Sequence, residues 1–204
     1  MDPLPELLRQ KADLRRQAEQ RRRDQPDKDA ISAAIVARFA DLSEYQAAPT
    51  VMLYVHVRDE VRTHDLIATA LAQGKRVVTP YCVDRDLELF HLENLSELAI
   101  GYYGLLEPRS ELRALPGKRI AIQQVDLVMT PGVAFDRQGG RLGHGKGFYD
   151  RLLARARPDT PRIAVAFECQ LFPQVPMADY DVPVDKVVTE LAAYPGRGRE
   201  AGRA

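Results

Sequence analysis

The stretch GGRLGHGKGFYDR, residues 139–151, holds the residues of this chain best suited to chemistry. Five glycines fall within nine positions, so the backbone can expose several N–H groups to an anion. Arg141 and Lys146 add two positive charges that can contact phosphate oxygens directly. Asp150 follows in the first turn of a predicted helix, and its carboxylate is a suitable ligand for Mg²⁺. The stretch therefore predicts a phosphate-binding site with a metal position beside it.

The same stretch departs from a P-loop. From Gly140 it reads Gly-x-x-x-x-Gly-Lys, but Gly147 stands where that motif has Ser or Thr. Roughly ten residues also separate the preceding strand from the glycines, whereas a P-loop follows its strand directly. A different phosphate cradle is the favoured interpretation. The alternative is a glycine-rich turn with solvated Arg and Lys side chains, in which Asp150 only stabilises the helix terminus.

Other polar residues have two interpretations each. Glu60 and Asp136 both follow the end of a predicted strand, at the sheet edge where α/β proteins bind ligands. Glu60 could orient a substrate or handle a proton, or be a surface residue of a charged loop, and Asp136 could equally cap a turn. Lys11 and Arg15 lie four residues apart on one face of a predicted helix. They could hold a polyphosphate or belong to a solvated basic face.

The elements that must position these residues alternate between strands and helices. Apolar residues at helical spacing and cap signals predict helices at 6–24, 27–42, 63–74 and 147–157. Apolar and β-branched runs predict strands at 50–57, 75–82, 87–92, 125–135 (ending at Pro131-Gly132), 162–168 and 185–190. This order predicts an α/β fold with a mainly parallel sheet and helices on both faces.

The boundaries of the domain follow from the same patterns. A single domain is expected over residues 1–194, with the two N-terminal helices packed on it. Residues 93–124 are harder to assign and could form an excursion over one sheet edge. Residues 195–204 lack apolar periodicity and are expected to be a disordered tail.

Composition narrows the class of protein. The 204 residues are 45% hydrophobic and 28% charged, the balance of a soluble globular protein. Lys+Arg and Asp+Glu are both 29, and this zero net charge argues against a nucleic-acid binder that would use the RRQAEQRRR run at 15–23. No apolar run approaches the ~20 residues that span a bilayer. Cys82 and Cys169 are the only cysteines, so we expect reduced thiols in a cytoplasmic protein.

Four motifs together resemble one family. They are KADLR near the start, VRDE after the first strand, MTPGVAFDRQGGRLGHGKGFYDR, and VPMADYDVPVDKVVTE near the end. In this order, from residue 6 to residue 190, they resemble the 5-formyltetrahydrofolate cyclo-ligases, also called methenyltetrahydrofolate synthetases. The resemblance implies a three-layer α/β/α sandwich that uses ATP and Mg²⁺ to convert 5-formyltetrahydrofolate to 5,10-methenyltetrahydrofolate, releasing ADP and phosphate. In the family mechanism the formyl oxygen attacks the γ-phosphate to give an iminium phosphate, which a neighbouring folate nitrogen then closes into a ring.

The resemblance also assigns roles by position. Lys11 and Arg15 would hold ATP phosphates, while Arg141 and Lys146 would act on the transferred phosphate. Asp150 and Asp181 match the family's Mg²⁺ ligands. Further ATP contacts are expected from Leu142, Gly143, His144, Gly145, Gly147, Phe148 and Tyr149, and folate contacts from Val55, Glu60, Tyr103, Phe148 and Tyr149.

Three positions depart from the family pattern. Phe148 replaces the first of a usual Tyr pair and lacks its hydroxyl, Tyr103 stands where some members have Trp, and His144 where others have Tyr or Arg. None of these removes a charge that the mechanism needs. The leading expectation is a monomeric enzyme acting on small molecules, with no nucleic-acid or membrane partner. The alternative is a non-catalytic or regulatory paralogue that binds ATP or reduced folate.

Overall fold

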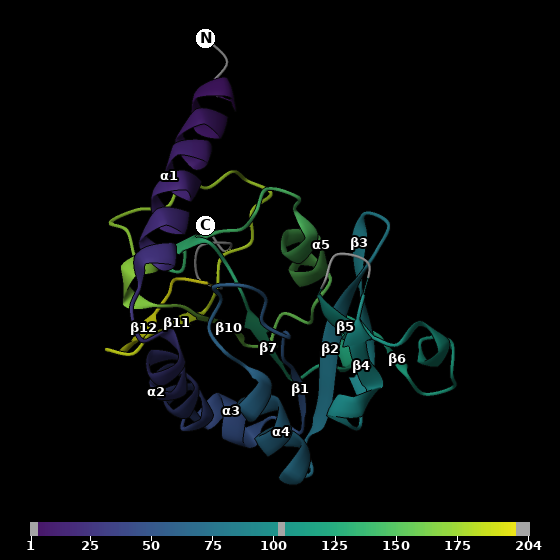
Figure 1. Cartoon of the computed structure of the whole chain (residues 1–204). Helices are drawn as coiled ribbons and strands as arrows, with labels where there is room; N and C mark the ends of the chain where they lie inside the picture. The colour runs from purple at the N-terminus through teal and green to yellow at the C-terminus, as the bar shows by residue number, and fades with distance from the viewer. Residues whose placement is uncertain (1–3, 102–104, 199–204) are drawn as a thin grey trace.

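An eight-stranded sheet forms the centre of the computed structural model, which describes residues 4–101 and 105–198 (Figure 1). The strand order is β12-β11-β10-β7-β1-β2-β3-β6. The strands from β11 to β2 pair in parallel, and β12, β3 and β6 add antiparallel at the two sides. The strand bounds are β1 Thr50–Met52, β2 Arg76–Val83, β3 Asp86–Leu92, β6 Arg119–Ile120, β7 Leu127–Thr130, β10 Arg162–Val165, β11 Lys186–Val188 and β12 Ala193–Pro195.

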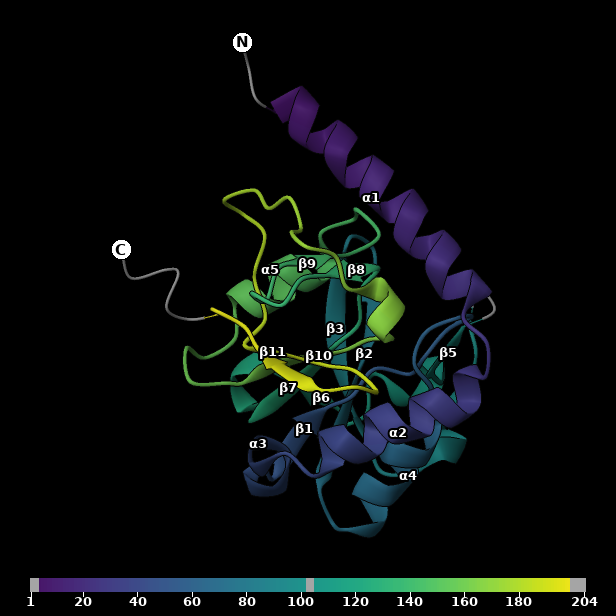
Figure 2. The same ribbon diagram turned by 90° about the vertical axis from the view of Figure 1, so that its left-hand side faces the viewer.

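Helices cover both faces of this sheet (Figure 2). Phe39 packs with Val51 in the core beneath one face, and Leu153 packs with Met52 in the core of the other. The side chains of successive strand residues point to opposite faces, so neighbouring residues of β1 pack in different cores. The predicted three-layer α/β/α sandwich is confirmed. The first core is covered by α2 Lys28–Ala40, α3 Ser43–Ala47 and α4 His64–Ala72, and the second by α5 Phe148–Ala154.

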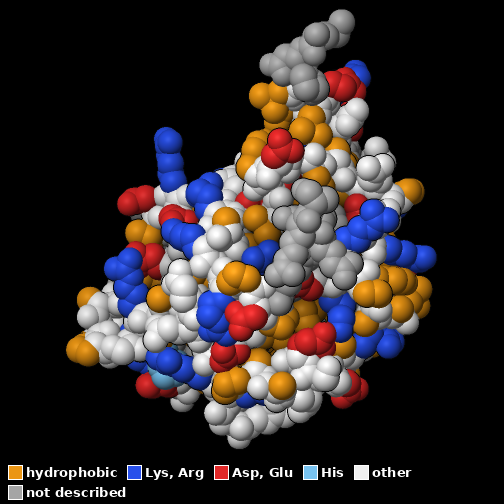
Figure 3. Space-filling view, turned by 180° about the vertical axis from the view of Figure 1, so that it is seen from behind, with side chains coloured by type: hydrophobic (Ala, Val, Ile, Leu, Met, Phe, Trp, Pro, Cys, Tyr) orange, Lys and Arg blue, Asp and Glu red, His pale blue; other side chains and the backbone are white. Residues whose placement is uncertain are grey.

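The long helix α1, Leu4–Asp24, packs on loops rather than on the sheet. Its Ala18 is fully buried against residues that follow β7 and β10, among them Val133 and Phe172. The N-terminal turns stand clear of the body (Figures 1 and 2), and Leu4 and Leu8 in them are exposed. Hydrophobic side chains gather at this end of the molecule in Figure 3. The C-terminal half of α1 therefore lies over the edge at which the parallel strands end.

The sheet has its switch point between β1 and β7. From β1 the chain moves to β2 on one side, and later strands β7, β10 and β11 are added on the other. Loops after β1 and β7 leave the sheet in opposite directions at such a point and open a crevice between them. The β1 loop carries Glu60, and the chain after β7 leads into the glycine stretch.

The predicted helices and strands are confirmed, but four strands are shorter than expected. β10 ends at Val165 rather than at residue 168, and β11 spans Lys186–Val188 rather than 185–190. β1 ends at Met52 rather than at residue 57. The Leu53 N–H still donates to Val78 O of β2, at 2.9 Å, but the His56 backbone N–H donates to the Thr63 side chain and not to a strand. Val55 is therefore a loop residue and not a strand residue. The predicted strand 125–135 is split at Pro131-Gly132 into β7 and β8, Ala134–Phe135, which pairs with β9, Arg141–Leu142.

Several elements lie outside the predicted pattern. Within 93–124, β4, Leu98–Ile100, pairs antiparallel with β5, Leu106–Pro108, and β6 then joins the sheet edge. Backbone bonding continues beyond the predicted domain end at 194: Pro195 belongs to β12, the Gly196 N–H lies 2.9 Å from Asp185 O, and the Arg197 N–H bonds to Gln138 O. The rest of the predicted tail, 199–204, lies outside the described residues. The 3₁₀ turns are η1 Leu95–Glu97, η2 Ser110–Leu112, η3 Ile122–Gln124 and η4 Glu168–Gln170.

Candidate active site

The turn between β8 and β9 supports the glycine stretch through Asp136. This buried carboxylate accepts N–H groups of Gln138 at 2.8 Å, Gly140 at 2.9 Å and Val175 at 2.8 Å. A Cβ at Gly140 would lie 2.3 Å from Asp136 Oδ2, so only glycine allows this approach. Both carboxylate oxygens are used by backbone donors, and of the two interpretations of Asp136 the turn cap is the one observed.

The loop 143–147 is exposed around two glycines with left-handed backbones. Gly145 has φ 88° and Gly147 has φ 67°, a region that side chains disfavour. Arg15 of α1 closes one side of this loop, since its Nε donates to Gly143 O at 2.8 Å. Its guanidinium carbon lies 3.4 Å from where a Cβ at Gly145 would stand. Arg15 thus joins the loop and α1 into one basic surface.

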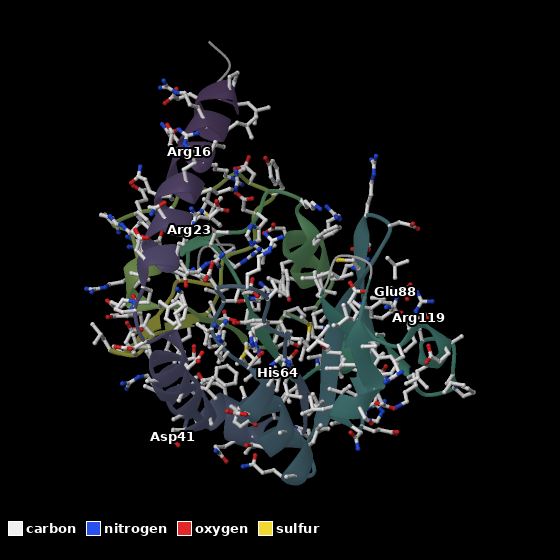
Figure 4. The ribbon with its side chains drawn as sticks, viewed as in Figure 1. Arg16, Arg23, Asp41, His64, Glu88 and Arg119 are labelled. Carbon is white, nitrogen blue, oxygen red and sulfur yellow. The ribbon has the colours of Figure 1, made fainter. Side chains whose placement is uncertain are left out.

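Two ion pairs bring four predicted charges together beside the loop. Arg141, which is 3% exposed, donates through Nη2 to Asp150 Oδ1 at 2.6 Å. Lys11, which is 4% exposed, contacts Asp181 Oδ2, so it belongs to no solvated face. The Val182 N–H donates to Asp150 Oδ1 at 3.1 Å, which brings the residue after Asp181 against Asp150. Nitrogen-rich side chains fill this space between α1 and α5, whereas Arg16 and Arg23 project from the outer side of α1 (Figure 4).

The ion pairs leave some atoms open to a ligand. The buried Nε of Arg141 has no hydrogen-bond partner among the described residues. Within the same residues, Asp150 Oδ2 and Asp181 Oδ1 accept no hydrogen bond, because the recorded donors all meet the other oxygen of each carboxylate. The site therefore offers an unsatisfied donor for an anion and two carboxylate oxygens for a cation.

Glu60 lies in the loop between β1 and α4 and is 8% exposed. Its Oε2 accepts the Val57 N–H at 3.1 Å. Burial raises the pKa of Glu60, although this hydrogen bond and the positive charge of Arg22 oppose the rise. Burial, followed by the Glu60 carboxylate, raises the pKa of Tyr149 well above its usual range. The Tyr149 ring centre lies 5.7 Å from the Arg141 guanidinium carbon, so this ring connects Glu60 with the basic site.

The remaining predicted site residues are less closely joined. Lys146 and His144 are exposed on the loop, Lys146 Nζ lying 5.9 Å from the Phe148 ring centre and His144 Nδ1 lying 3.7 Å from a carboxylate oxygen of Glu19. The Leu142 side chain is buried in the core beneath α1 and can offer only its backbone to a ligand. Tyr103 lies outside the described residues.

One residue of the site was missed by sequence reasoning. Arg22, buried in the last turn of α1, donates through Nη1 to Gly132 O at 3.3 Å and lowers the pKa of Glu60 by its charge. Lys11, Arg15, Ala18 and Arg22 share one helical face because their spacings are four, three and four. That periodicity was the signal that could have distinguished Arg22 from the arginines around it.

The fold and the site define a class of protein: a three-layer α/β protein with a basic, glycine-rich loop beside the switch point of its sheet. Among the described residues no helix is long and apolar enough to cross a bilayer. The chain belongs to the 5-formyltetrahydrofolate cyclo-ligase family, whose sequence model matches residues 8–190.

Relatives with known names support this membership. A probable 5-formyltetrahydrofolate cyclo-ligase from Schizosaccharomyces pombe is 31% identical over 175 residues, covering 79% of this chain and 84% of the relative. The Escherichia coli 5-formyltetrahydrofolate cyclo-ligase is 34% identical over 151 residues, covering 70% and 78%. The solved structure of 5,10-methenyltetrahydrofolate synthetase from Aquifex aeolicus matches with a TM-score of 0.79 at 31% identity, covering 92% of this chain and 93% of that one. The Mycoplasma pneumoniae synthetase, at 22% identity and a TM-score of 0.70 over 88% and 98% of the two chains, shows the same fold.

Proposed function

We propose that the protein converts 5-formyltetrahydrofolate to 5,10-methenyltetrahydrofolate at the expense of ATP, releasing ADP and phosphate. The observation that carries the proposal is the meeting of two cation–carboxylate pairs with a glycine loop, beside the buried Glu60. Such a site can hold a triphosphate at one end and a polar heterocycle at the other. Its place at the switch point agrees with the way α/β proteins bind ligands.

The phosphate end is built from side chains of α1 and of the glycine loop. Lys11 and Arg15 approach from the helix, and Arg141 and Lys146 belong to the loop. These charges would neutralise the γ-phosphate as the formyl oxygen attacks phosphorus and the bond to the ADP oxygen breaks. The backbone of 142–149 would supply N–H donors. Ring closure by the neighbouring folate nitrogen then expels phosphate and gives the product.

The residues present fit a magnesium ion. Asp150 and Asp181 are neighbours, and each has a carboxylate oxygen that accepts no hydrogen bond from the described residues. The described part of the chain has no group of three or more His, Cys, Asp or Glu side chains placed to hold a metal ion without further ligands. This suits Mg²⁺, which is held by one or two carboxylates together with phosphate oxygens and water. When bound, the ion would neutralise charge on the phosphates.

The folate end lies around Glu60. Its Oε2 is used by the Val57 N–H, so its other oxygen remains to accept a hydrogen bond from an N–H group of the pterin. Tyr149 and Phe148 offer aromatic surface next to it, and Val55 adds an apolar contact from the β1 loop. Tyr103 completes this end in the proposal.

The proposal includes the oligomeric state, the partners and the cellular location of the enzyme. We expect a monomer that acts on ATP and folate without nucleic acid, and a cytoplasmic location, in keeping with the free thiols of Cys82 and Cys169. Light scattering coupled to size-exclusion chromatography tests the oligomeric state.

A near-ultraviolet absorbance assay for methenyltetrahydrofolate tests the reaction. Purified protein is incubated with (6S)-5-formyltetrahydrofolate and Mg²⁺, with and without ATP. Product that forms only with ATP is the expected result. Absence of product from protein that ATP stabilises thermally would instead indicate a non-catalytic binder of ATP or reduced folate.

A further inference from the structure

Reciprocal hydrogen bonds between His56 and Thr63 join the two ends of the loop that carries Glu60. The His56 N–H donates to Thr63 Oγ1 at 3.1 Å, and the Thr63 N–H donates to His56 Nδ1 at 3.1 Å. The Thr63 hydroxyl donates in turn to Tyr54 O at 2.7 Å. Thr63 stands at the N-cap position of α4 but makes no side-chain cap bond there. Its hydroxyl bonds to the backbone of the loop instead. We call these contacts between His56 and Thr63 the His56–Thr63 clasp.

The clasp requires one form of the His56 ring. Since Nδ1 accepts the Thr63 N–H, this nitrogen carries no proton, and the ring is neutral with its proton on Nε2. The His64 ring packs edge-on against it, with ring centres 4.4 Å apart (His64 is labelled in Figure 4). This packing orients the His56 ring beyond what the hydrogen bond alone provides.

The residues inside the clasp form a tight turn that holds Glu60. The Glu60 N–H donates to Val57 O at 3.1 Å, while the Val57 N–H donates back to Glu60 Oε2. Arg58 between them has φ 50°, a left-handed backbone that is costly for a side chain. A strained turn persists only when its surroundings hold it in place. The clasp lies directly at the base of this turn, one residue before Val57.

We propose that His56 is a positioning residue for the folate end of the site: through Nδ1 it fixes the turn at 57–60 and thereby the direction of the Glu60 carboxylate. This inference rests on the proposed function, because it takes Glu60 to contact the folate. The contacts of His56 are with Thr63 and His64, so in this proposal it meets neither substrate. Its effect should therefore fall on folate and leave ATP untouched.

Two substitutions separate this role from mere packing. His56→Asn keeps an acceptor at the position of Nδ1, since Asn Oδ1 occupies the corresponding place, whereas His56→Leu removes it. We expect His56→Leu to raise the KM for 5-formyltetrahydrofolate on the order of tenfold, with the KM for ATP unchanged. His56→Asn should restore most of the loss. His91→Leu, the same change on β3, serves as the matched control and should leave both KM values unchanged.

A readout independent of catalysis distinguishes failure of this inference from failure of the proposed function. Amide hydrogen exchange should accelerate at Val57–Glu60 in His56→Leu and in Thr63→Val, but not in His56→Asn or Thr63→Ser. If amide exchange at this turn is unchanged in His56→Leu and Thr63→Val, the clasp does not hold the turn, whatever activity the variants retain. Faster exchange with an unchanged folate KM would overturn the positioning role, as would equal effects on the KM for ATP. Wild-type protein that makes no product refutes the proposed function, and the positioning role then falls with it.

Discussion

The charged residues of the site pair with one another. Lys11 pairs with Asp181 and Arg141 with Asp150, and all four side chains are largely buried. A phosphate that arrives alone must compete with a carboxylate for each cation, and a metal ion that arrives alone must compete with a cation for each carboxylate. Arrival of both together leaves every charge paired. We therefore expect ATP and the metal ion to bind with positive cooperativity.

Lys146 differs from these residues because it is exposed and its ammonium has no carboxylate partner within the described part of the chain. Lys146→Ala should lower kcat/KM about a hundredfold, since a charge near the transferred phosphate is lost. The thermal midpoint should stay unchanged. Arg16→Ala, on the outer side of α1, is the control and should retain wild-type kcat/KM. A Lys146→Ala enzyme with normal kcat/KM would remove this residue from the mechanism.

Asp181→Asn tests the burial of the Lys11 charge. The variant keeps an acceptor for the Ala178 N–H, which lies 2.6 Å from Asp181 Oδ2, but leaves the Lys11 ammonium without a counter-charge. We expect the free energy of unfolding in urea to fall by about 3 kcal/mol. Asp13→Asn removes the exposed partner of Arg16 and should cost less than about 0.5 kcal/mol. Equal losses in the two variants would show that Lys11 is more solvated than the structure indicates.

His56 also predicts a dependence of stability on pH. Burial, the neighbouring His64 and then Arg62 lower the pKa of His56 to about 4 from 6.5, while Asp29 and Asp65 oppose the shift. Between these values the unfolded chain binds a proton at this position and the folded chain does not, so stability falls as pH falls from 6.5 toward 4. Urea unfolding over this range should show a shallower decline in His56→Asn than in the wild type. If the stability of the two proteins depends on pH in the same way, the lowered pKa of His56 is contradicted.

Helices and strands could largely be predicted from the sequence because their apolar periodicity is local. α1, α2 and α4 have apolar residues at helical spacing, and the central strands are β-branched runs buried on both faces. β12 and the short pair β8–β9 could not be predicted, since strands of two or three residues are too short to show an alternating pattern. The site was limited by a different factor. Glycines and charges were visible in sequence, but the burial of Lys11 depends on contact with Asp181, which no local pattern contains.

The glycine loop is an element whose backbone shape should matter for ATP and little for the fold. Gly145→Ala forces a side chain into a left-handed backbone and places its Cβ against Arg15. Gly117 also has a left-handed backbone, with φ 80°, but a Cβ there would meet nothing within 4 Å. Both Ala variants should lose about 1 kcal/mol of stability, and only Gly145→Ala should raise the KM for ATP. A similar ATP KM in both variants would argue against a cradle at this loop.

Across the whole molecule, the site unites regions that are remote in the chain. α1 supplies Lys11 and Arg15, the β1 loop supplies Glu60, and the last third of the sequence supplies the glycine loop and Asp181. The sheet makes this meeting possible, because its parallel strands, from β11 to β2, all end at one edge whatever their order in sequence. α1 crosses that edge and completes the site from above (Figure 2).

The contact between Lys11 and Asp181 joins residues that are 170 positions apart. During synthesis on the ribosome, Lys11 therefore emerges 170 residues before the carboxylate that neutralises it. A nascent chain can form α1 from local interactions, but the buried ammonium of Lys11 has its partner only once residue 181 has been made. The order of synthesis thus delays the assembly of this part of the site relative to the helix that carries it.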